Sequence, residues 1–466
     1  LGLRYQRQAG YSVDGNKFGV FDPTLPNPGP FIPPNTLGAL LYGGNNGRNQ
    51  IENDVNEFAP RIGLAWSPWN KWAFRASYGI FDSPRDAEAY TDGVLALGLN
   101  PQGSMGFSNS VIFKLKTGPA PGSVVFPTLS TLSPALLNFK DVHYYNPNLP
   151  IQYSQEIYLD VQREMPGGLL LDAAYVHTKG THLNFSRDLN QVPENLLGTG
   201  ARPFVQFATI KNHAFDGYSN YNALQLRAVK RLTHGLSFQV NYAWSKLLDT
   251  GTGSGHSDSV DIWQNAYNIR ANYGPSTLDA THNFTGFVSY ELPVGEGRMF
   301  PVHGLLNGVI GGWRISSIFT ARSGIPFTPT VGTDASGALS GSCFCGFSLF
   351  PNRVGSGKLA NPTINQWFDP TAFTVPAPNT FGDSGRNILR GPHYVDFDMS
   401  LGKGFRIREG MGLEIRADAF NALNHPNFNL PDSNVVAGST SIGKITSTTT
   451  NGGPDRIIQL GARFWF

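Results

Sequence analysis

The chain has few cysteines, no long apolar run and little net charge. Its two cysteines, Cys343 and Cys345, stand one residue apart, which would strain a disulfide and supplies only half of a zinc motif. No stretch approaches the roughly 18 consecutive apolar residues of a transmembrane helix. The net charge is +2 and charged residues are spread along the chain, so no basic patch indicates a nucleic-acid partner. A disulfide scaffold, a helical membrane protein and a nucleic-acid-binding domain are therefore excluded, while the oxidation state of the cysteines stays open.

Motifs for catalysis and metal binding are also missing. The sequence contains no G-x-S-x-G, H-E-x-x-H, phosphate-binding or dinucleotide-binding motif. The carboxylates between Asp249 and Asp261 do not fit a calcium-loop spacing, so a loop is the simpler prediction there. His177 and His182 flank another predicted loop, with no third metal ligand at useful spacing. We expect no enzymatic activity, cofactor or metal, although a Ser/His or Asp/His pair assembled from distant segments would be identified only by geometry.

Glycine, proline and aromatic residues are abundant. The 54 Gly and 33 Pro indicate many turns, and the 32 Phe, 17 Tyr and 8 Trp are favoured in strands and at membrane interfaces. Apolar and polar residues alternate in segments of about ten residues, as where Leu236, Phe238 and Val240 alternate with Ser237 and Gln239. About ten residues is the length with which a tilted strand crosses a bilayer. The chain is predicted to be all-β.

The alternating segments recur as hairpins, and about twelve strands are predicted. The strand that contains Leu224, Leu226 and Ala228 joins the next one through the turn Thr233-His234-Gly235. The remaining predicted strands are Leu1 to Arg7, Phe58 to Ser67, Trp72 to Phe81, Gln152 to Glu164, Leu169 to Thr178, Leu236 to Ser245, His282 to Leu292, Trp313 to Arg322, Val395 to Phe405, Met411 to Phe420 and Arg456 to Phe466.

The connections between the predicted strands alternate in length. Short turns of roughly two to five residues, with one longer exception, follow every second strand, and segments of roughly 35 to 70 residues follow the others. Compact soluble domains rarely carry repeated long loops, whereas outer-membrane barrels place short turns in the periplasm and long loops outside the cell. The pattern predicts an antiparallel up-and-down transmembrane β-barrel in the cell outer membrane, with long extracellular loops and short periplasmic turns.

The last strand carries a second signal. Ile458, Leu460, Ala462, Phe464 and Phe466 form one apolar face that ends in a terminal aromatic residue. Many β proteins also end on an aromatic strand, so this pattern alone is not specific. Bacterial outer-membrane barrels characteristically end in this way, and the resemblance implies that Phe464 and Phe466 are recognised by the barrel-insertion machinery.

Several segments resemble the barrel of TonB-dependent receptors of the Oar-like group. They are FDPTLPNP from Phe21, NEFAPRIGLAWSPWNKWAFRASYGIF from Asn56, NYAWSKLLD from Asn241, DATHNFTGFVSYELPVGEGR from Asp279, FGDSGRNILRGPHYVDFDMSLGKGF from Phe381, RADAFNALNHPNF from Arg416 and the terminal IIQLGARFWF. Each segment is loosely defined, but their order and spacing cover most of the chain.

The resemblance implies a barrel of about 22 strands with an N-terminal plug and a short TonB-binding segment. Residues 1–466 are then expected to be the C-terminal portion of such a barrel domain, without its signal peptide, plug and first strands. The chain has no initiator Met and begins inside a predicted strand, which fits this interpretation. The strand from Leu1 to Arg7 and the last strand would need further strands as partners, because unpaired backbone groups are costly in hydrocarbon.

Two sets of candidate functional residues follow from the alternation. Polar side chains predicted to face the lumen are Gln225, Arg227, Gln239, Asn241, Glu414, Arg416, Asp418 and Arg463. Mutual hydrogen bonding across strands is the simpler expectation for them than contact with a substrate. Aromatic side chains predicted to lie at the membrane interfaces are Trp66, Tyr78, Tyr175, Tyr242, Trp244 and Phe464, for which ordinary sandwich packing is the alternative.

The leading functional hypothesis is a receptor that imports a bulky nutrient. Loops would capture an unknown extracellular ligand, the lumen would be its route, and the TonB complex would act through an N-terminal part of the protein. A surface adhesion or assembly protein anchored by the barrel is the first alternative, with the segments Asp82 to Pro150 and Ser323 to His393 as binding regions. A passive pore is the second. Outer-membrane lipid is the expected surrounding, and the sequence does not identify the ligand.

Overall fold

The computed structural model describes residues 1–10, 19–42, 53–83, 133–135, 138–144, 146–251, 264–332, 335–338, 349–436, 438–449 and 455–466. Cys343, Cys345 and most of the segment from Asp249 to Asp261 lie outside these ranges, as does most of the segment from Asp82 to Pro150. Within the described ranges, the model contains no helix with the length and apolarity needed to cross a membrane.

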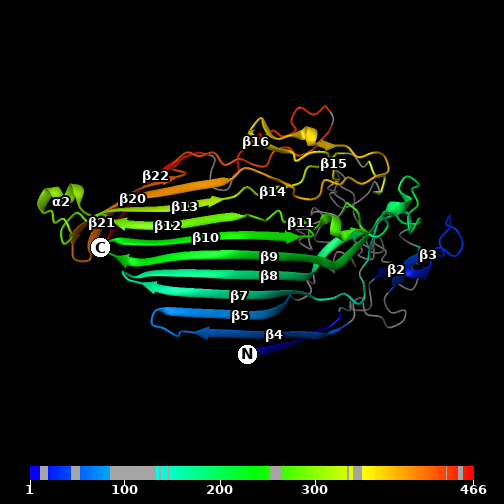
Figure 1. Cartoon of the computed structure of the whole chain (residues 1–466), viewed down its shortest axis with the longest axis horizontal. Helices are drawn as coiled ribbons and strands as arrows, with labels where there is room; N and C mark the ends of the chain where they lie inside the picture. Colours follow the sequence, from blue (N-terminus) through cyan, green and yellow to red (C-terminus); the bar gives the residue numbers. More distant parts are fainter. Residues whose placement is uncertain are drawn as a thin grey trace, which may run out of the picture.

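One large antiparallel sheet dominates the molecule, and twelve of its strands follow each other in chain order (Figure 1). These strands are β1 (Gly2–Gln8), β4 (Asp54–Trp66), β5 (Trp72–Ser83), β7 (Gln152–Met165), β8 (Leu169–Asp188), β9 (Ile210–Thr233), β10 (Leu236–Asp249), β12 (His282–Glu291), β13 (Trp313–Arg322), β20 (Tyr394–Arg408), β21 (Met411–Phe420) and β22 (Ile457–Trp465). The prediction of an all-β chain with about twelve up-and-down strands is confirmed. The order runs from β1 to β22, and the described residues show no pairing between these two end strands.

Short turns join the strands at one end of the sheet, because the turn residues adopt conformations that reverse the chain within a few residues. The predicted turn between β9 and β10 consists of His234 at φ 52° and Gly235 at φ 79°. Positive φ at both central residues is what a two-residue hairpin turn requires, and glycine adopts it without a steric penalty. The longer exception is the connection between β12 and β13, which contains helix α2 (Gly304–Ile310).

The long connections gather at the opposite end of the sheet from α2 (Figure 1). They contain β2 (Gly19–Pro26), β3 (Leu37–Tyr42), β6 (Val142–Tyr144), β11 (Gly274–Pro275), β14 (Pro326–Phe327), β15 (Asn352–Arg353), β16 (Lys358–Thr363), β17 (Gln366–Phe368), β18 (Phe373–Thr374) and β19 (Leu389–Arg390). Short 3-10 helices at Glu194–Leu196, Ile269–Asn272 and Pro370–Ala372 lie in the same connections. We refer to the two ends of the sheet as the short-turn end and the loop end.

Strands β8 and β9 are longer than the alternation predicts. The first was expected to end at Thr178, but it has 20 residues and continues to Asp188. The second has 24 residues and begins at Ile210. The first six residues of β9 are all buried, and a strand buried on both faces shows no period of two in its sequence.

Two further expectations change with these lengths. His177 and His182 lie inside β8 and do not flank a loop, so the expectation of loop histidines was wrong. The segment between β8 and β9 is also shorter than the roughly 35 to 70 residues expected of the long connections. Both errors have the same cause, because the additional strand residues were counted as part of a loop.

The hydrophobic clusters of the described chain lie at the loop end rather than along the alternating part of the sheet. The first cluster consists of Phe21, Leu40, Tyr42, Val142, Phe207 and Ile210. The second consists of Phe327, Phe368, Ala372, Phe373, Leu389 and Val435. Large apolar side chains of the sheet itself remain exposed, including Leu3 at 69% and Leu460 at 78%. A sheet with exposed apolar side chains and loops with buried ones is the arrangement expected when the sheet contacts lipid.

Candidate functional site

Pairing between neighbouring strands divides the side chains of the sheet into two faces. Residues directly opposite each other in an antiparallel pair point to the same face, and successive residues alternate. Arg227 lies opposite both Asp172 and Asn241, and we call their side the polar face. Leu226 lies opposite both Ala173 and Tyr242, and we call that side the apolar face.

All eight residues predicted to face the lumen lie on the polar face. The strand pairings connect this face from β9 and β10 through β12, β13 and β20 to β21 and β22. Along it lie Gln225, Arg227, Gln239, Asn241, Glu414, Arg416, Asp418 and Arg463. Apolar residues also occur on this face, among them the opposed pairs Phe287 with Ile318 and Leu170 with Val229. The pairing thus brings the eight residues to one surface, and their contact with a passing ligand stays a prediction.

All six predicted interface aromatics lie on the apolar face. They are Trp66, Tyr78, Tyr175, Tyr242, Trp244 and Phe464. At the short-turn end, Trp66 belongs to a group of rings with Trp69 at 6.2 Å and Phe74 at 5.7 Å between centroids. Trp72 stacks on Phe74 in the same group. Rings gathered at one level of the sheet are typical of an interfacial belt, and this role stays a prediction for the six residues.

Four side chains that the sequence interpretation missed form a hydrogen-bonded ladder on the polar face. Arg75 donates through Nη1 to Oδ2 of Asp160 at 2.8 Å and through Nη2 to Oε1 of Gln162 at 3.2 Å. Gln162 Nε2 then donates to Oδ2 of Asp172 at 2.9 Å. The Asp160 side chain is fully buried, although Arg75 remains half exposed. The alternation within the predicted strands could have found these residues, because each occupies a polar position.

A second polar group lies on β13, β20 and β21. Arg314 Nη2 donates to Oε1 of Glu414 at 2.6 Å, and Arg416 Nε donates to Oδ2 of Asp418 at 2.8 Å. A groove of about 450 Å³ lies beside these pairs, and its lining includes Ser400. Glu414, Arg416 and Asp418, three of the eight predicted residues, therefore form ion pairs within the protein. This agrees with the expectation that these polar side chains bond to one another.

Between the two groups, the polar face continues with neutral amides and hydroxyls. Asn241 Nδ2 donates to Oγ1 of Thr285 at 3.3 Å, and Gln239 Nε2 donates to Oδ1 of Asn241 at 3.4 Å. Ser316 Oγ donates to Oγ of Ser289 at 3.1 Å. These groups extend the hydrogen-bonding surface across β10, β12 and β13. The polar face is thus continuous from β5 to β21.

At the loop end, two arginines attach the connection between β13 and β20 to the sheet. Arg386 forms an ion pair with Asp249, the last residue of β10, and both side chains are buried. Arg386 Nε also donates to the backbone carbonyl of Asn272 at 3.0 Å. Arg390 forms an ion pair with the buried carboxylate of Asp279. The family-like segments that contain these residues are distant in sequence and adjacent in the fold.

Buried amide side chains connect three of the long connections to one another. Gln191 Nε2 donates to the backbone carbonyl of Gln264 at 2.9 Å, and its Oε1 accepts from the Ala266 N–H at 2.6 Å. Gln264 Nε2 donates to the Gly382 carbonyl at 2.9 Å, and its Oε1 accepts from the Phe350 N–H at 2.7 Å. Each amide therefore uses both its donor and its acceptor, which is how a buried polar group avoids a desolvation penalty.

Asp188 ends β8 in the part of the sheet that lies beyond the alternating, membrane-spanning half. Its Oδ1 accepts from the N–H groups of Asn190 at 2.8 Å and Ile210 at 3.0 Å. Burial nevertheless raises the pKa of the Asp188 carboxyl to about 6, because desolvation outweighs these hydrogen bonds. Burial likewise raises the pKa of Tyr267 to about 12. The Tyr267 hydroxyl donates to the carbonyl of Gln191 at 2.9 Å.

The described residues offer no group of three or more His, Cys, Asp or Glu side chains that could hold a metal ion. Within β8, His177 Nδ1 lies 2.9 Å from Oδ1 of Asn222, and the His182 ring meets Tyr153 edge-on at 5.7 Å between centroids. Both histidines thus contact other side chains of the sheet.

An up-and-down sheet with one polar and one lipid-contacting face, capped by folded loops at one end, is the architecture of an outer-membrane β-barrel domain. The family model described as an outer membrane beta barrel domain matches residues 1–459. The chain belongs to this family, and its location is the outer membrane.

Three solved structures to which the chain is similar come from different bacteria. The FrpB iron transporter from Neisseria meningitidis (F3-3 variant) is 11% identical with a TM-score of 0.40, covering 88% of this chain and 39% of its own. The outer membrane transporter YddB from Escherichia coli is 11% identical with a TM-score of 0.41, covering 88% and 40%. The siderophore receptor PiuA from Acinetobacter baumannii is 10% identical with a TM-score of 0.41, covering 92% and 38%.

The chain therefore spans about two fifths of the length of these three proteins. Among curated proteins, none matches the sequence.

Proposed function

We propose that residues 1–466 form the C-terminal portion of the barrel of a TonB-dependent receptor of the Oar-like group, which imports a bulky nutrient across the outer membrane. The loop end would capture the ligand, and the polar face would line its route through the lumen. A plug and a TonB-binding segment elsewhere in the protein would close the route and couple it to energy. The sequence segments that resemble this group support the assignment, and the barrel family supports the membrane context.

The observation that carries the proposal is the continuous polar face beneath a folded loop end. Its side chains form hydrogen bonds and ion pairs with one another, so a ligand would move along a surface that is already polar and ordered. The ion pairs of Arg386 with Asp249 and of Arg390 with Asp279 attach the connection between β13 and β20 above this surface. Binding a ligand and letting it pass along this face would involve no bond-making chemistry. We therefore propose a non-enzymatic role without cofactor.

An uptake screen tests this proposal. The full-length gene is deleted in its own host, and accumulation of a broad panel of labelled metal chelates, peptides and glycans is measured with and without collapse of the proton gradient. We expect gradient-dependent accumulation of at least one compound to be lost and to return with the wild-type gene. If accumulation of every compound is unchanged, the import proposal is wrong.

The hydrophobic clusters in the loops favour a second candidate, a surface adhesion or assembly protein. A connection with its own buried core, such as the one that contains Phe327, Phe368 and Leu389, is ordered enough to present a binding surface without any transport. In that case deletion of residues 323–393 from the full-length protein would abolish surface attachment while nutrient uptake remained normal. A passive pore would instead give steady ion conductance from the intact protein in a planar bilayer.

A further inference from the structure

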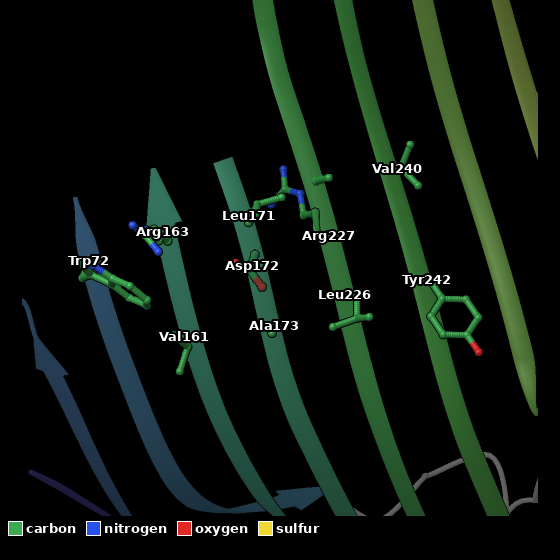
Figure 2. A pocket seen from close by; sticks show the side chains of 11 residues that line it. Trp72, Val161, Arg163, Leu171, Asp172, Ala173, Leu226, Arg227, Val240 and Tyr242 are labelled. Carbon is green, nitrogen blue, oxygen red and sulfur yellow. The ribbon is translucent and has the colours of Figure 1, made fainter. Parts of the chain in front are cut away.

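A groove of about 460 Å³ crosses the apolar face near the short-turn end (Figure 2). Two rows of opposed side chains line it. The first row is Trp72, Arg163, Leu171, Ala228 and Val240, and the second contains Val161, Ala173, Leu226 and Tyr242. Asp172 and Arg227 also border the groove, but the strand pairing assigns their side chains to the polar face. The lining is therefore apolar apart from Arg163 and the Tyr242 hydroxyl.

Arg163 is the unexpected member of this lining. Its guanidinium lies 4.6 Å from the ring centroid of Trp72, and Figure 2 shows the two side chains directed toward each other. The side chain is exposed and has no ion pair or hydrogen bond with the described residues. A guanidinium carries five N–H donors, and the described residues supply no hydrogen-bond acceptor for them. The ring fixes the cation in place, but its donors require an acceptor from outside the protein.

The charge around Arg163 selects the acceptor. No carboxylate occurs on the apolar face in the two groove rows or in the next row toward the turns, which contains Met165, Leu169 and Lys230. Lys230 adds a second cation there, and its Nζ donates to the Gly167 carbonyl at 2.8 Å. Short turns of outer-membrane barrels face the periplasm, so these cations lie level with the lipid headgroups of the inner leaflet. The surroundings favour an anionic headgroup.

The floor of the groove suits an acyl chain. Ala228 and Ala173 occupy adjacent rows and form a depression, because the neighbouring positions hold the larger Leu171, Leu226 and Val161. Figure 2 shows Val161 and Leu226 on either side of Ala173. A hydrocarbon chain placed there gains dispersion contacts on both sides, which a flat apolar surface does not provide.

We propose that this groove is a binding site for one anionic glycerophospholipid of the phosphatidylglycerol type. The phosphodiester accepts hydrogen bonds from the Arg163 guanidinium beside Trp72, and one acyl chain lies over Ala173 and Ala228. The guanidinium contacts the phosphodiester, and the two cations Arg163 and Lys230 favour a headgroup with net negative charge over phosphatidylcholine, whose phosphate is balanced by its own choline cation. The proposal depends on the outer-membrane location and not on nutrient import, so it stands if the import proposal fails.

Native mass spectrometry of the full-length protein in detergent tests the site. The protein is titrated with phosphatidylglycerol or with phosphatidylcholine of the same chains, and the bound lipids are counted. The variants are Arg163→Gln, which removes the cation, and Ala228→Phe, which fills the depression. Arg4→Gln on the polar face of β1 is the matched control, because it removes one exposed arginine from the opposite side of the sheet. Heat-modifiable gel migration confirms that each variant is folded.

We expect the wild type and Arg4→Gln to hold one phosphatidylglycerol about tenfold more tightly than phosphatidylcholine. Arg163→Gln should lose this preference, and Ala228→Phe should weaken both lipids. The proposal is overturned if Arg163→Gln binds phosphatidylglycerol as tightly as the wild type. A further variant, Lys230→Gln, removes the second cation, and the proposal is also overturned if this variant alone loses the preference. The same holds if the purified protein retains lipopolysaccharide at this groove in place of phospholipid.

Discussion

Arg386 and Asp249 form a buried ion pair between residues that are 137 positions apart in the sequence. Their side chains are 2% and 7% exposed, so water does not screen the interaction. Asp249 ends a strand of the sheet, whereas Arg386 belongs to the long connection between β13 and β20. The pair therefore holds this connection against the loop end of β10.

Removing the arginine should release the connection. In Arg386→Met the carboxylate of Asp249 loses its cation while remaining buried, and breaking a pair in this way costs about 3–5 kcal/mol. Protease cleavage between residues 349 and 393 in the intact membrane protein should accelerate by at least one hundredfold. The measurement is the rate at which these fragments appear on gels and in mass spectra.

Two further variants make this prediction specific. Arg353→Met changes an exposed arginine of the same connection and should alter stability by less than about 0.5 kcal/mol. Combining Arg386→Met with Asp249→Leu removes both charges and should recover most of the lost protection. Equal cleavage rates in the wild type and Arg386→Met would show that the pair does not hold the connection.

Asp188 gives the loop end a pH dependence. Its folded pKa of about 6 lies above the ordinary value of 3.8, so the folded state binds the proton more tightly. This contribution to stability is fully present below about pH 4 and is lost as the pH rises through 6, a difference of about 3 kcal/mol for two pKa units. Hydrogen exchange of residues 189–210, corrected for intrinsic rates, should show greater protection at pH 4.5 than at pH 7.

The variant Asp188→Asn should remove this difference. An amide oxygen can accept the same two bonds from Asn190 and Ile210, but it carries no proton that titrates in this range. The expected result is equal corrected protection at both pH values. A variant that retains the pH dependence would assign it to another group.

Asn427 bonds to the edge of β20 at Val395, where the pairing with β21 has not yet begun. Its Oδ1 accepts from the Val395 N–H at 2.8 Å, and its Nδ2 donates to the Val395 carbonyl at 2.8 Å. Asn427→Ala should destabilise this end of β20 by about 1–2 kcal/mol, because two partly buried backbone groups lose their partners. Asn427→Asp retains the acceptor and should cost less. Hydrogen exchange of the Val395 amide measures the effect, and unchanged exchange in Asn427→Ala would contradict it.

Arg75 and Asp160 provide a test of the polar face. Arg75→Met leaves the fully buried Asp160 carboxylate without its cation, and we expect a loss of about 1–3 kcal/mol in unfolding free energy. Urea unfolding of the full-length protein in lipid vesicles, followed by tryptophan fluorescence, gives this value. Arg4→Met, an exposed arginine on the same face, serves as the control. If both variants lose the same stability, the pairing with Asp160 is not the cause.

The sheet could be predicted from sequence because lipid and water impose a local period of two on each strand. Pairing of adjacent strands then placed residues such as Arg227 and Trp244 on opposite faces, as their polarity indicated. The contacts of the loop end could not be predicted in this way. The pair of Arg390 and Asp279, for example, depends on chain segments that meet only after the sheet has formed.

The buried parts of β8 and β9 were the other place where the prediction from sequence was wrong. The beginning of β9, from Ile210, contains lysine, asparagine and histidine and resembles a loop in composition. These polar residues lie within a sheet because neighbouring chain covers them, a tertiary effect that composition does not reveal. Arg163 was likewise overlooked, since a single cation in an apolar row does not disturb the alternation.

The unequal length of the strands has a consequence for the height at which recognition occurs. About ten residues of a strand cross the membrane, so the remaining part of the 24-residue β9 extends up to about 45 Å beyond it at roughly 3.3 Å per residue. The hydrophobic cluster that includes Phe207 and Ile210 is attached to this extension. One side of the loop end thus carries a strand extension, and under the proposed function a large ligand would contact this extension before it reached the lumen.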